Sequence, residues 1–280
     1  MPRFSPYITH AIRAARAAGE IQRDLFGRRL EIDFKGWHDP VTEADRAAED
    51  AIVSMLSRAF PTHAFLAEER GQQGDSAYTW LVDPLDGTNN FTHAIPWFAV
   101  SIALRHGGRL VAGAVLNTML GEVYVAEAGG GAYRSRIAEL PRDPEGWAEW
   151  PGWRRILVSD VGRLDQTLLS TGFPRRVATT GINLDHFANF MMAEAKTRQG
   201  GSAALALVAV AQGQIDGYWE IGPKAWDFAA GALLVEEAGG RVSDLRGRPV
   251  SEYGGQLLAT NGRIHDQMVA VLAKGKSGLE

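Results

Sequence analysis

The chain has 280 residues, of which 45% are hydrophobic and 22% are charged, and its net charge is −4 at pH 7. This composition is typical of a globular protein with one large domain or two closely joined halves, and the weak negative charge excludes a general electrostatic surface for nucleic acid. The sequence has no cysteine, which excludes disulfides, thiolate zinc sites and iron–sulfur clusters.

The N-terminal segment predicts a helix rather than a targeting signal. Ser5 and Pro6 form a typical helix start, with serine as the N-cap. Apolar residues then recur at roughly helical spacing as far as Gly27, with arginines scattered between them. The longest small-apolar run, Ser202–Ala211, is too short to cross a bilayer. We therefore expect a cytoplasmic protein that binds neither a membrane nor nucleic acid.

A second helix and a series of strands are predicted in the rest of the first half. The helix spans about Glu43 to Ala59 and stops before Pro61. Short buried strands are expected at Ala64–Ala67 and Thr79–Val82. In residues 97–126, apolar residues alternate with small or polar ones around a glycine turn, which predicts an antiparallel meander.

Residues 134–154 contain three prolines, three tryptophans and many charges, which predicts a surface excursion that packs back on the body. The second half alternates helices with strands. Helices are expected at Asn183–Ala195, Ser202–Gln212, Ala225–Ala238 and Ile264–Ala273, and strands at Gln214–Glu220 and Gln256–Thr260. We expect one α+β domain over residues 1–280, with an N-terminal α+β half (about 1–133), the excursion (about 134–154) and a C-terminal α/β half (about 155–280).

The stretch from Trp80 to Thr88 carries the strongest chemical signal. A buried strand runs into Asp83 and Asp86, with a proline between them and Gly87 after them. The proline and the glycine let the chain turn so that both carboxylates point at one place, beside free N–H groups of the following turn. Hard divalent cations prefer oxygen ligands, and free N–H groups bind phosphate. The segment thus predicts a metal site next to a phosphate site.

Alone, such a pair of aspartates is more often an ordinary strand-to-helix turn with an N-cap. Three further acidic positions favour a metal site. Glu68 and Glu69 follow an apolar strand, Asp45 lies at a helix start, and Asp227 interrupts an apolar helix. A buried acid is unfavourable unless it is paired or binds a metal ion.

Taken together, these motifs resemble the inositol monophosphatase family of the lithium-sensitive, magnesium-dependent phosphatase superfamily. The resemblance covers residues about 35 to 240, and several motifs occur in the family's order. They are Asp39-Pro-Val-Thr-Glu-Ala-Asp45, Glu68-Glu69, Asp83-Pro-Leu-Asp-Gly-Thr-Asn-Asn-Phe91, Gly201-Ser-Ala-Ala204, Asp216-Gly-Tyr-Trp-Glu220 and Trp226-Asp-Phe-Ala-Ala-Gly231. The resemblance implies a layered α-β-α-β-α sandwich of the inositol monophosphatase and fructose-1,6-bisphosphatase type, and a homodimer.

The resemblance also implies roles for individual residues. Metal ligands are expected at Glu68, Asp83, Asp86 and Asp227, with the backbone carbonyl of Leu85. The phosphate-holding turn corresponds to Gly87 and Thr88. Thr88 and Glu68 would orient the attacking water, and Asp45 would be an acid outside the first layer of ligands. The substrate's hydroxyl side is expected to be lined by Gly201, Ser202, Ala203, Glu220 and Asp227.

Three positions depart from the family's pattern. Ala67 replaces a usual glycine before the glutamate pair, and Asn89 replaces a frequent threonine. Ala206 stands where aspartate or asparagine is common. Ala206 and the excursion, which does not follow the family's pattern, leave the identity of the substrate open. Neither changes the reaction that the resemblance implies.

The implied reaction is hydrolysis of a small phosphorylated polyol by in-line attack of a water activated by Mg²⁺. Inositol monophosphate is the leading substrate, and the alternatives are fructose bisphosphate, histidinol phosphate and adenosine bisphosphate. Neither the number of metal ions nor the degree of lithium sensitivity follows from the sequence.

Two other classes of protein are alternatives. A serine hydrolase could use Ser202, Asp227 and His265, which occur in hydrolase order. Such an enzyme needs a buried strand just before its serine, whereas Glu194–Gln199 is polar and predicts a helix, so Ser202 is better explained as a helix N-cap. A non-enzymatic interaction protein could present the tryptophans of the excursion to a partner.

Overall fold

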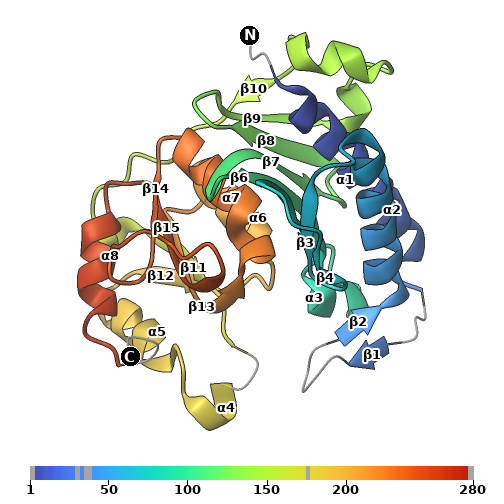
Figure 1. Cartoon of the computed structure of the whole chain (residues 1–280). Helices are drawn as coiled ribbons and strands as arrows, with labels where there is room; N and C mark the ends of the chain where they lie inside the picture. Colours follow the sequence, from blue (N-terminus) through green and yellow to red (C-terminus); the bar gives the residue numbers. More distant parts are fainter. Residues whose placement is uncertain (1–3, 29–31, 35–39, 175–176, 277–280) are drawn as a thin grey trace.

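Two β-sheets alternate with three layers of helices through the molecule (Figure 1). The computed structural model describes residues 4–28, 32–34, 40–174 and 177–276. Asp39, the first residue of one predicted motif, lies outside the described residues. No helix in the described ranges is long and apolar enough to cross a bilayer. The five layers confirm the predicted α-β-α-β-α sandwich.

The larger sheet has eight strands and contains the predicted meander. Its spatial order is β10-β9-β8-β7-β6-β5-β3-β4, and every neighbouring pair is antiparallel except β3 and β5. The strands are β3 (Ala64–Ala67), β4 (Gly71–Gln73), β5 (Tyr78–Asp86), β6 (Ala99–His106), β7 (Arg109–Asn117), β8 (Glu122–Glu127), β9 (Gly131–Arg136) and β10 (Arg154–Arg155). A separate two-stranded ribbon is formed by β1 (Ile32–Phe34) and β2 (Pro40–Thr42).

Helices α1 (Pro6–Leu25) and α2 (Glu43–Ala59), both predicted from the sequence, cover the outer face of this sheet (Figure 1). The predicted cap of α1 is wrong in one respect. Ser5 stands at the N-cap position, but its hydroxyl makes no cap hydrogen bond and is buried without a partner in the described part of the chain. Its backbone N–H instead donates to Glu127 Oε2 at 3.0 Å, so the helix start is fastened to the sheet.

The middle layer consists of α6 (Ala203–Ala211) and α7 (Ala225–Glu237). Every residue of α6 is buried, because one side of the layer meets the large sheet and the other the small sheet. The two helices approach closely at Gly231, where an added Cβ would lie 2.5 Å from the Cβ of Leu207. Two sheets therefore share one apolar core.

The smaller sheet has five strands in the order β12-β11-β13-β15-β14. They are β11 (Leu168–Thr171), β12 (Lys196–Arg198), β13 (Gly217–Lys224), β14 (Arg241–Ser243) and β15 (Gly254–Thr260). Helices α5 (Leu184–Met192) and α8 (His265–Leu272) cover its outer face, and α4 (Val177–Thr180) lies before α5. Strands β11, β12 and β14 were not predicted, and β13 begins and ends later than expected.

The predicted helix over Glu194–Gln199 is wrong. Glu194 has a φ of 62°, which ends α5, and Lys196–Arg198 then forms the edge strand β12, paired in parallel with β11. An edge strand can expose polar side chains, so its polarity does not exclude a strand.

The excursion packs back on the body, as its tryptophans predict. It starts inside β9 and ends in β10, and between them lie the short 3₁₀ helices η1 (Ile137–Glu139) and η2 (Pro144–Glu149); a further one, η3, spans Leu164–Gln166. Trp147 and Trp153 are buried beside α1. Their indole N–H groups donate to the carbonyls of Pro141 and Trp147, at 2.6 and 2.8 Å.

Candidate active site

Two pairs of parallel strands, one from each sheet, end at the same cavity. In the large sheet, β3 and β5 run in parallel with Ala67 beside Val82, so the next residues, Glu68 and Asp83, come together. In the small sheet, Thr171 of β11 lies beside Trp219 of β13, so Gly172 and Glu220 meet in the same way. Because parallel strands end at one edge, residues far apart in the sequence converge there.

Strand β5 continues through both predicted aspartates instead of ending at Val82. It is buried from Thr79 to Asp86, and its pairing with β6 shifts between Asp83 and Asp86. Such a bulge, which also accommodates the missing N–H of Pro84, changes the direction of the following side chains. Both aspartates consequently line the cavity.

Gly87 makes the turn from β5 into the short helix α3 (Thr88–Thr92). Its φ is 102°, and an added Cβ would lie 3.1 Å from the carbonyl oxygen of Trp97 and 3.2 Å from that of Gly201. Only glycine fits both the backbone conformation and the space. The turn that the sequence predicted is therefore built as expected.

The cavity has a volume of about 250 Å³ and contains every predicted site residue except Asp45. None of its described lining residues is lysine, arginine or histidine. The lining comprises Glu68, Asp83, Leu85, Asp86, Gly87, Thr88, Asn89, Ser170, Thr171, Gly172, Phe173, Gln199, Gly200, Gly201, Ser202, Ala203, Tyr218, Glu220 and Asp227.

Asp86 is held by the N-terminus of α6. Ser202 Oγ donates to its carboxylate, and the backbone N–H groups of Ala203 and Ala204 donate to it at 3.2 and 2.7 Å. Ser202 also caps the helix by accepting from the N–H of Leu205. Burial raises the pKa of Asp86 to about 6, although these three bonds favour its charged form. Ser202 and Ala203 thus border the cavity but direct their donors to Asp86.

Asp45 lies just behind the cavity and reaches it through Thr88. It is the third residue of α2, and its Oδ2 accepts from the N–H of Thr42 at 2.7 Å and from the Thr42 hydroxyl at 2.6 Å. Thr88 Oγ1 donates to Asp45 Oδ1 at 3.0 Å or to the carbonyl of Leu85 at 3.1 Å. Burial raises the pKa of Asp45, and its hydrogen bonds to Thr42 and Thr88 oppose that rise.

Two further acids face the cavity from the small sheet and the middle layer. Asp227, the third residue of α7, accepts from the N–H of Lys224 at 2.7 Å. Burial raises the pKa of Asp227 well above its usual range, and the charges of Glu220, Glu68 and Asp86 add to the rise. Burial, with the charge of Asp86, raises the pKa of Glu220 to about 7. Tyr218 donates its hydroxyl to Glu220 Oε2 at 2.5 Å.

The donor set fits a hard divalent cation. Burial raises the pKa of Asp83 well above its usual range, and the charges of Glu68, Asp86 and Asp227 raise it further. No described lining residue neutralises this negative charge, and carboxylate and carbonyl oxygens are the ligands that Mg²⁺ accepts. Among the described residues, no three acidic or histidine side chains already surround one point as a metal site. The chemistry of the site therefore calls for a cation without fixing its geometry.

The serine hydrolase alternative is not supported by the geometry. Ser202 Oγ donates to Asp86, while both ring nitrogens of the buried His265 are engaged elsewhere, with Ser243 Oγ and Thr260 Oγ1, each at 2.9 Å. Asp227 contacts the backbone of Lys224. The three predicted residues do not form a hydrogen-bonded triad.

Sequence reasoning missed several lining residues, chiefly Ser170 to Phe173, Gln199 and Tyr218. The first group spans the end of β11 and the two residues after it, and β11 is a four-residue strand too short to predict. Tyr218 lay inside a motif that the sequence singled out, two residues before Glu220, so strand periodicity could have placed both on one face. Asn90 was also missed: its amide donates to the carbonyls of Trp97 and Gly200, which ties α3 to the loop before α6.

Comparison with known proteins identifies a family. The model of the inositol monophosphatase family matches residues 4–276. An inositol-1-monophosphatase of Mesorhizobium japonicum is 41% identical over 274 residues, covering 94% of each chain. The Nus factor SuhB of Pseudomonas aeruginosa is 40% identical over 279 residues, covering 96% of each. The crystal structure of the extragenic suppressor protein suhB from Bartonella henselae superposes with a TM-score of 0.86 at 38% identity, covering 97% of this chain and all of that one.

Proposed function

The chain belongs to the inositol monophosphatase family, and we propose that it hydrolyses the phosphate monoester of a small polyol, with inositol monophosphate as the leading substrate and Mg²⁺ as the cofactor. The observation that carries this proposal is the acidic cavity at which both sheets and the N-termini of α6 and α7 meet. A dianionic phosphate can enter such a cavity only with cations that neutralise the carboxylates.

The phosphate side of the cavity is formed by the large sheet. Mg²⁺ held by Glu68, Asp83, Asp86, Asp227 and the carbonyl of Leu85 would supply positive charge for the phosphate and lower the pKa of a water molecule. The turn at Gly87 and Thr88, which lines the cavity beside these acids, would offer its backbone N–H groups to the phosphate. Thr88, by donating to Asp45, keeps its oxygen lone pairs available to accept a hydrogen bond from the attacking water, which Glu68 would also contact.

The hydroxyl side of the cavity is formed by the small sheet and the loop before α6. Glu220 is half-buried and accepts from Tyr218, and its carboxylate packs directly against Gly172, where an added Cβ would collide with Glu220 Oε1. A carboxylate fixed in this way in the cavity wall suits the hydroxyl groups of a polyol. Ala206, within buried α6, adds no polar group to the substrate side.

A screen of phosphate release tests this function. The substrates are inositol monophosphate, fructose bisphosphate, histidinol phosphate and adenosine bisphosphate, each with saturating Mg²⁺. We expect fastest turnover of inositol monophosphate and, from the family resemblance, inhibition by lithium at matched ionic strength. Turnover of none of the four would refute the proposal.

The names of relatives favour a second candidate, a Nus-factor role. This role and phosphatase activity are separable, because Asp86→Asn removes a charge inside the cavity and leaves the surface unchanged. We also propose a homodimer and a cytoplasmic location, as the family resemblance implies. Sedimentation analysis of the full chain tests the homodimer.

A further inference from the structure

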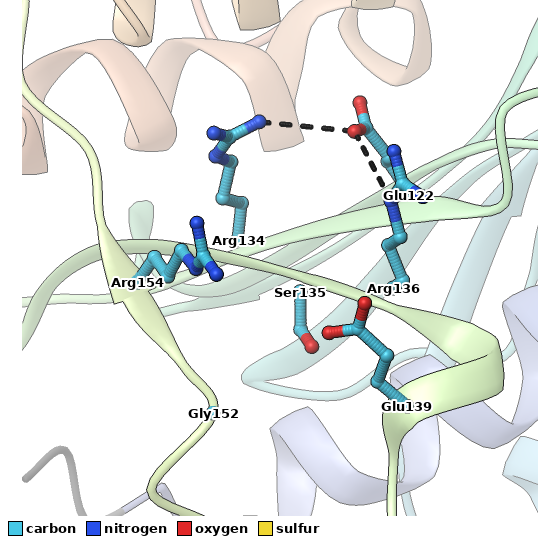
Figure 2. Close-up of a pocket in the computed structure, with 7 residues that line it drawn as sticks. All are labelled: Glu122, Arg134, Ser135, Arg136, Glu139, Gly152 and Arg154. Carbon is cyan, nitrogen blue, oxygen red and sulfur yellow. Dashed lines mark ion pairs between the residues drawn. The ribbon is translucent and has the colours of Figure 1, made fainter.

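A second cavity, at the outer end of the large sheet, has the opposite electrostatic character. It has a volume of about 270 Å³ and is lined by Glu122, Arg134, Ser135, Arg136, Glu139, Gly152 and Arg154 (Figure 2). Strands β8, β9 and β10 carry most of these residues, and β7 and β6 separate them from β5. At about 4.8 Å per strand, β9 lies roughly 19 Å from the catalytic strand.

The positive charge of this cavity is poorly compensated. Arg134 Nη1 and Arg136 Nε both approach one oxygen of Glu122, at 3.7 and 3.8 Å. These distances exceed those of charge-assisted hydrogen bonds. The other oxygen of Glu122 accepts from the hydroxyl of Tyr124 at 2.7 Å. One carboxylate therefore serves two guanidinium groups loosely.

Arg154 adds a third positive charge in an unfavourable place. It stands directly opposite Arg134 in the pairing of β10 with β9, and like charges at opposed positions destabilise a sheet. Within the described chain, Arg154 forms no ion pair. An anion bound between the guanidinium groups of Arg134 and Arg154 would replace this repulsion with attraction.

The arginines gather on one face of β9, and the neighbouring Ser135 points to the other face. The Ser135 side chain is 7% exposed, and its hydroxyl oxygen is buried, without a hydrogen-bond partner among the described residues. It therefore does not reach an anion held by Arg134 and Arg136. Strand β10 pairs with β9 only at Tyr133 and Arg134, so Ser135 and Arg136 lie on an edge of β9 that β10 leaves unpaired. Figure 2 shows Arg134 and Arg136 extending to one side of this edge and Ser135 and Glu139 to the other.

We propose that this cavity binds a phosphate group, either free orthophosphate or the phosphate of a small phosphorylated metabolite. The planar guanidinium forks of Arg134, Arg136 and Arg154 match the oxygens of a phosphate. The volume is too small for most drug-sized ligands but suits such a group. Unlike the catalytic cavity, it needs no metal ion to accept an anion.

Calorimetric titration of metal-free full-length protein at constant ionic strength tests the proposal. The probes are inorganic phosphate and glycerol 2-phosphate, which distinguish a free phosphate from an esterified one. Without metal ions the acidic catalytic cavity repels both probes, so the result does not depend on the proposed function. We expect saturable binding of at least one probe, and a rise of Tm on its addition.

Variants assign the binding to this cavity. Arg154→Gln and Arg134→Gln should each weaken binding about tenfold. Glu139→Gln should strengthen it severalfold, because the exposed carboxylate repels an anion. Arg263→Gln, which makes the same charge change in the loop before α8, is the control and should have no effect.

The expected pattern is loss in the arginine variants, gain in Glu139→Gln and no change in Arg263→Gln. The surface position of Arg154 makes its variant the one least able to disturb folding, and thermal melting checks this. The proposal is overturned if neither probe binds saturably, or if Arg154→Gln binds as tightly as the unaltered protein.

Discussion

Replacing Glu220 with glutamine separates the hydroxyl side of the cavity from its phosphate side. Glutamine keeps an oxygen that can accept from Tyr218, so the local structure should persist. What changes is the charge. A hydrogen bond to a charged acceptor contributes roughly 1.5–3 kcal/mol and a neutral one roughly 0.5–1.5 kcal/mol. Each polyol hydroxyl that contacts Glu220 should therefore lose about 1–1.5 kcal/mol, or about 5- to 12-fold in kcat/KM.

The assay compares two substrates at pH 8, above the pKa of about 7 that burial gives Glu220. In the proposed binding mode the hydroxyls of inositol monophosphate face Glu220, and p-nitrophenyl phosphate has no such hydroxyls. We expect the loss in kcat/KM only for the first. Glu236→Gln, the same chemical change at an exposed site on α7, is the matched control. Equal losses on both substrates would make Glu220 a metal or folding residue and refute the division of the cavity.

Three further predictions concern the charge of the site, the middle layer and the core. Asp86→Asn should reduce kcat by at least about 100-fold for every ester, because the stabilisation of negative charge at the phosphoryl group is lost whatever the alcohol is. Steady-state kinetics on both substrates checks this. Gly231→Ala should destabilise the fold by about 1–2 kcal/mol in urea unfolding, because its Cβ would crowd Leu207 by more than helix propensity returns; an unchanged midpoint contradicts the close packing of α6 on α7. Burial lowers the pKa of His265 from 6.5 to about 4, so as the pH falls the histidine of the unfolded chain takes up a proton before that of the folded protein. The stability that the neutral His265 contributes is therefore complete above pH 6.5 and is lost as the pH falls toward 4. Urea unfolding across that window should show a weaker pH dependence for His265→Gln than for the unaltered protein.

Local motifs allowed much of the site to be predicted. Asp83, Asp86 and Gly87 lie within five residues, so their meeting depends on one bulge and one turn. Helix α2 was predicted with its exact bounds, because its helical pattern stops before Pro61. The resemblance to a family supplied distant members such as Glu220.

Features that depend on tertiary pairing could not be predicted. The strand β5 was expected to end at Val82, since a proline usually breaks a strand, but the bulge accommodates it. Strand β12 was predicted as helix because its polarity is that of an exposed edge, which only the sheet order reveals. The bonds from Ser202 to Asp86 join residues 116 positions apart. Likewise, Arg134 and Arg154 meet only because β10 returns to β9.

The central claim is that the acidic cavity hydrolyses phosphate esters only with a bound divalent cation. The most direct test measures phosphate release from inositol monophosphate by metal-free protein, first in excess EDTA and then during titration with Mg²⁺. We predict no turnover in EDTA, saturable activation by Mg²⁺, and no activation of Asp86→Asn over the same range. Full turnover in excess EDTA would contradict the claim.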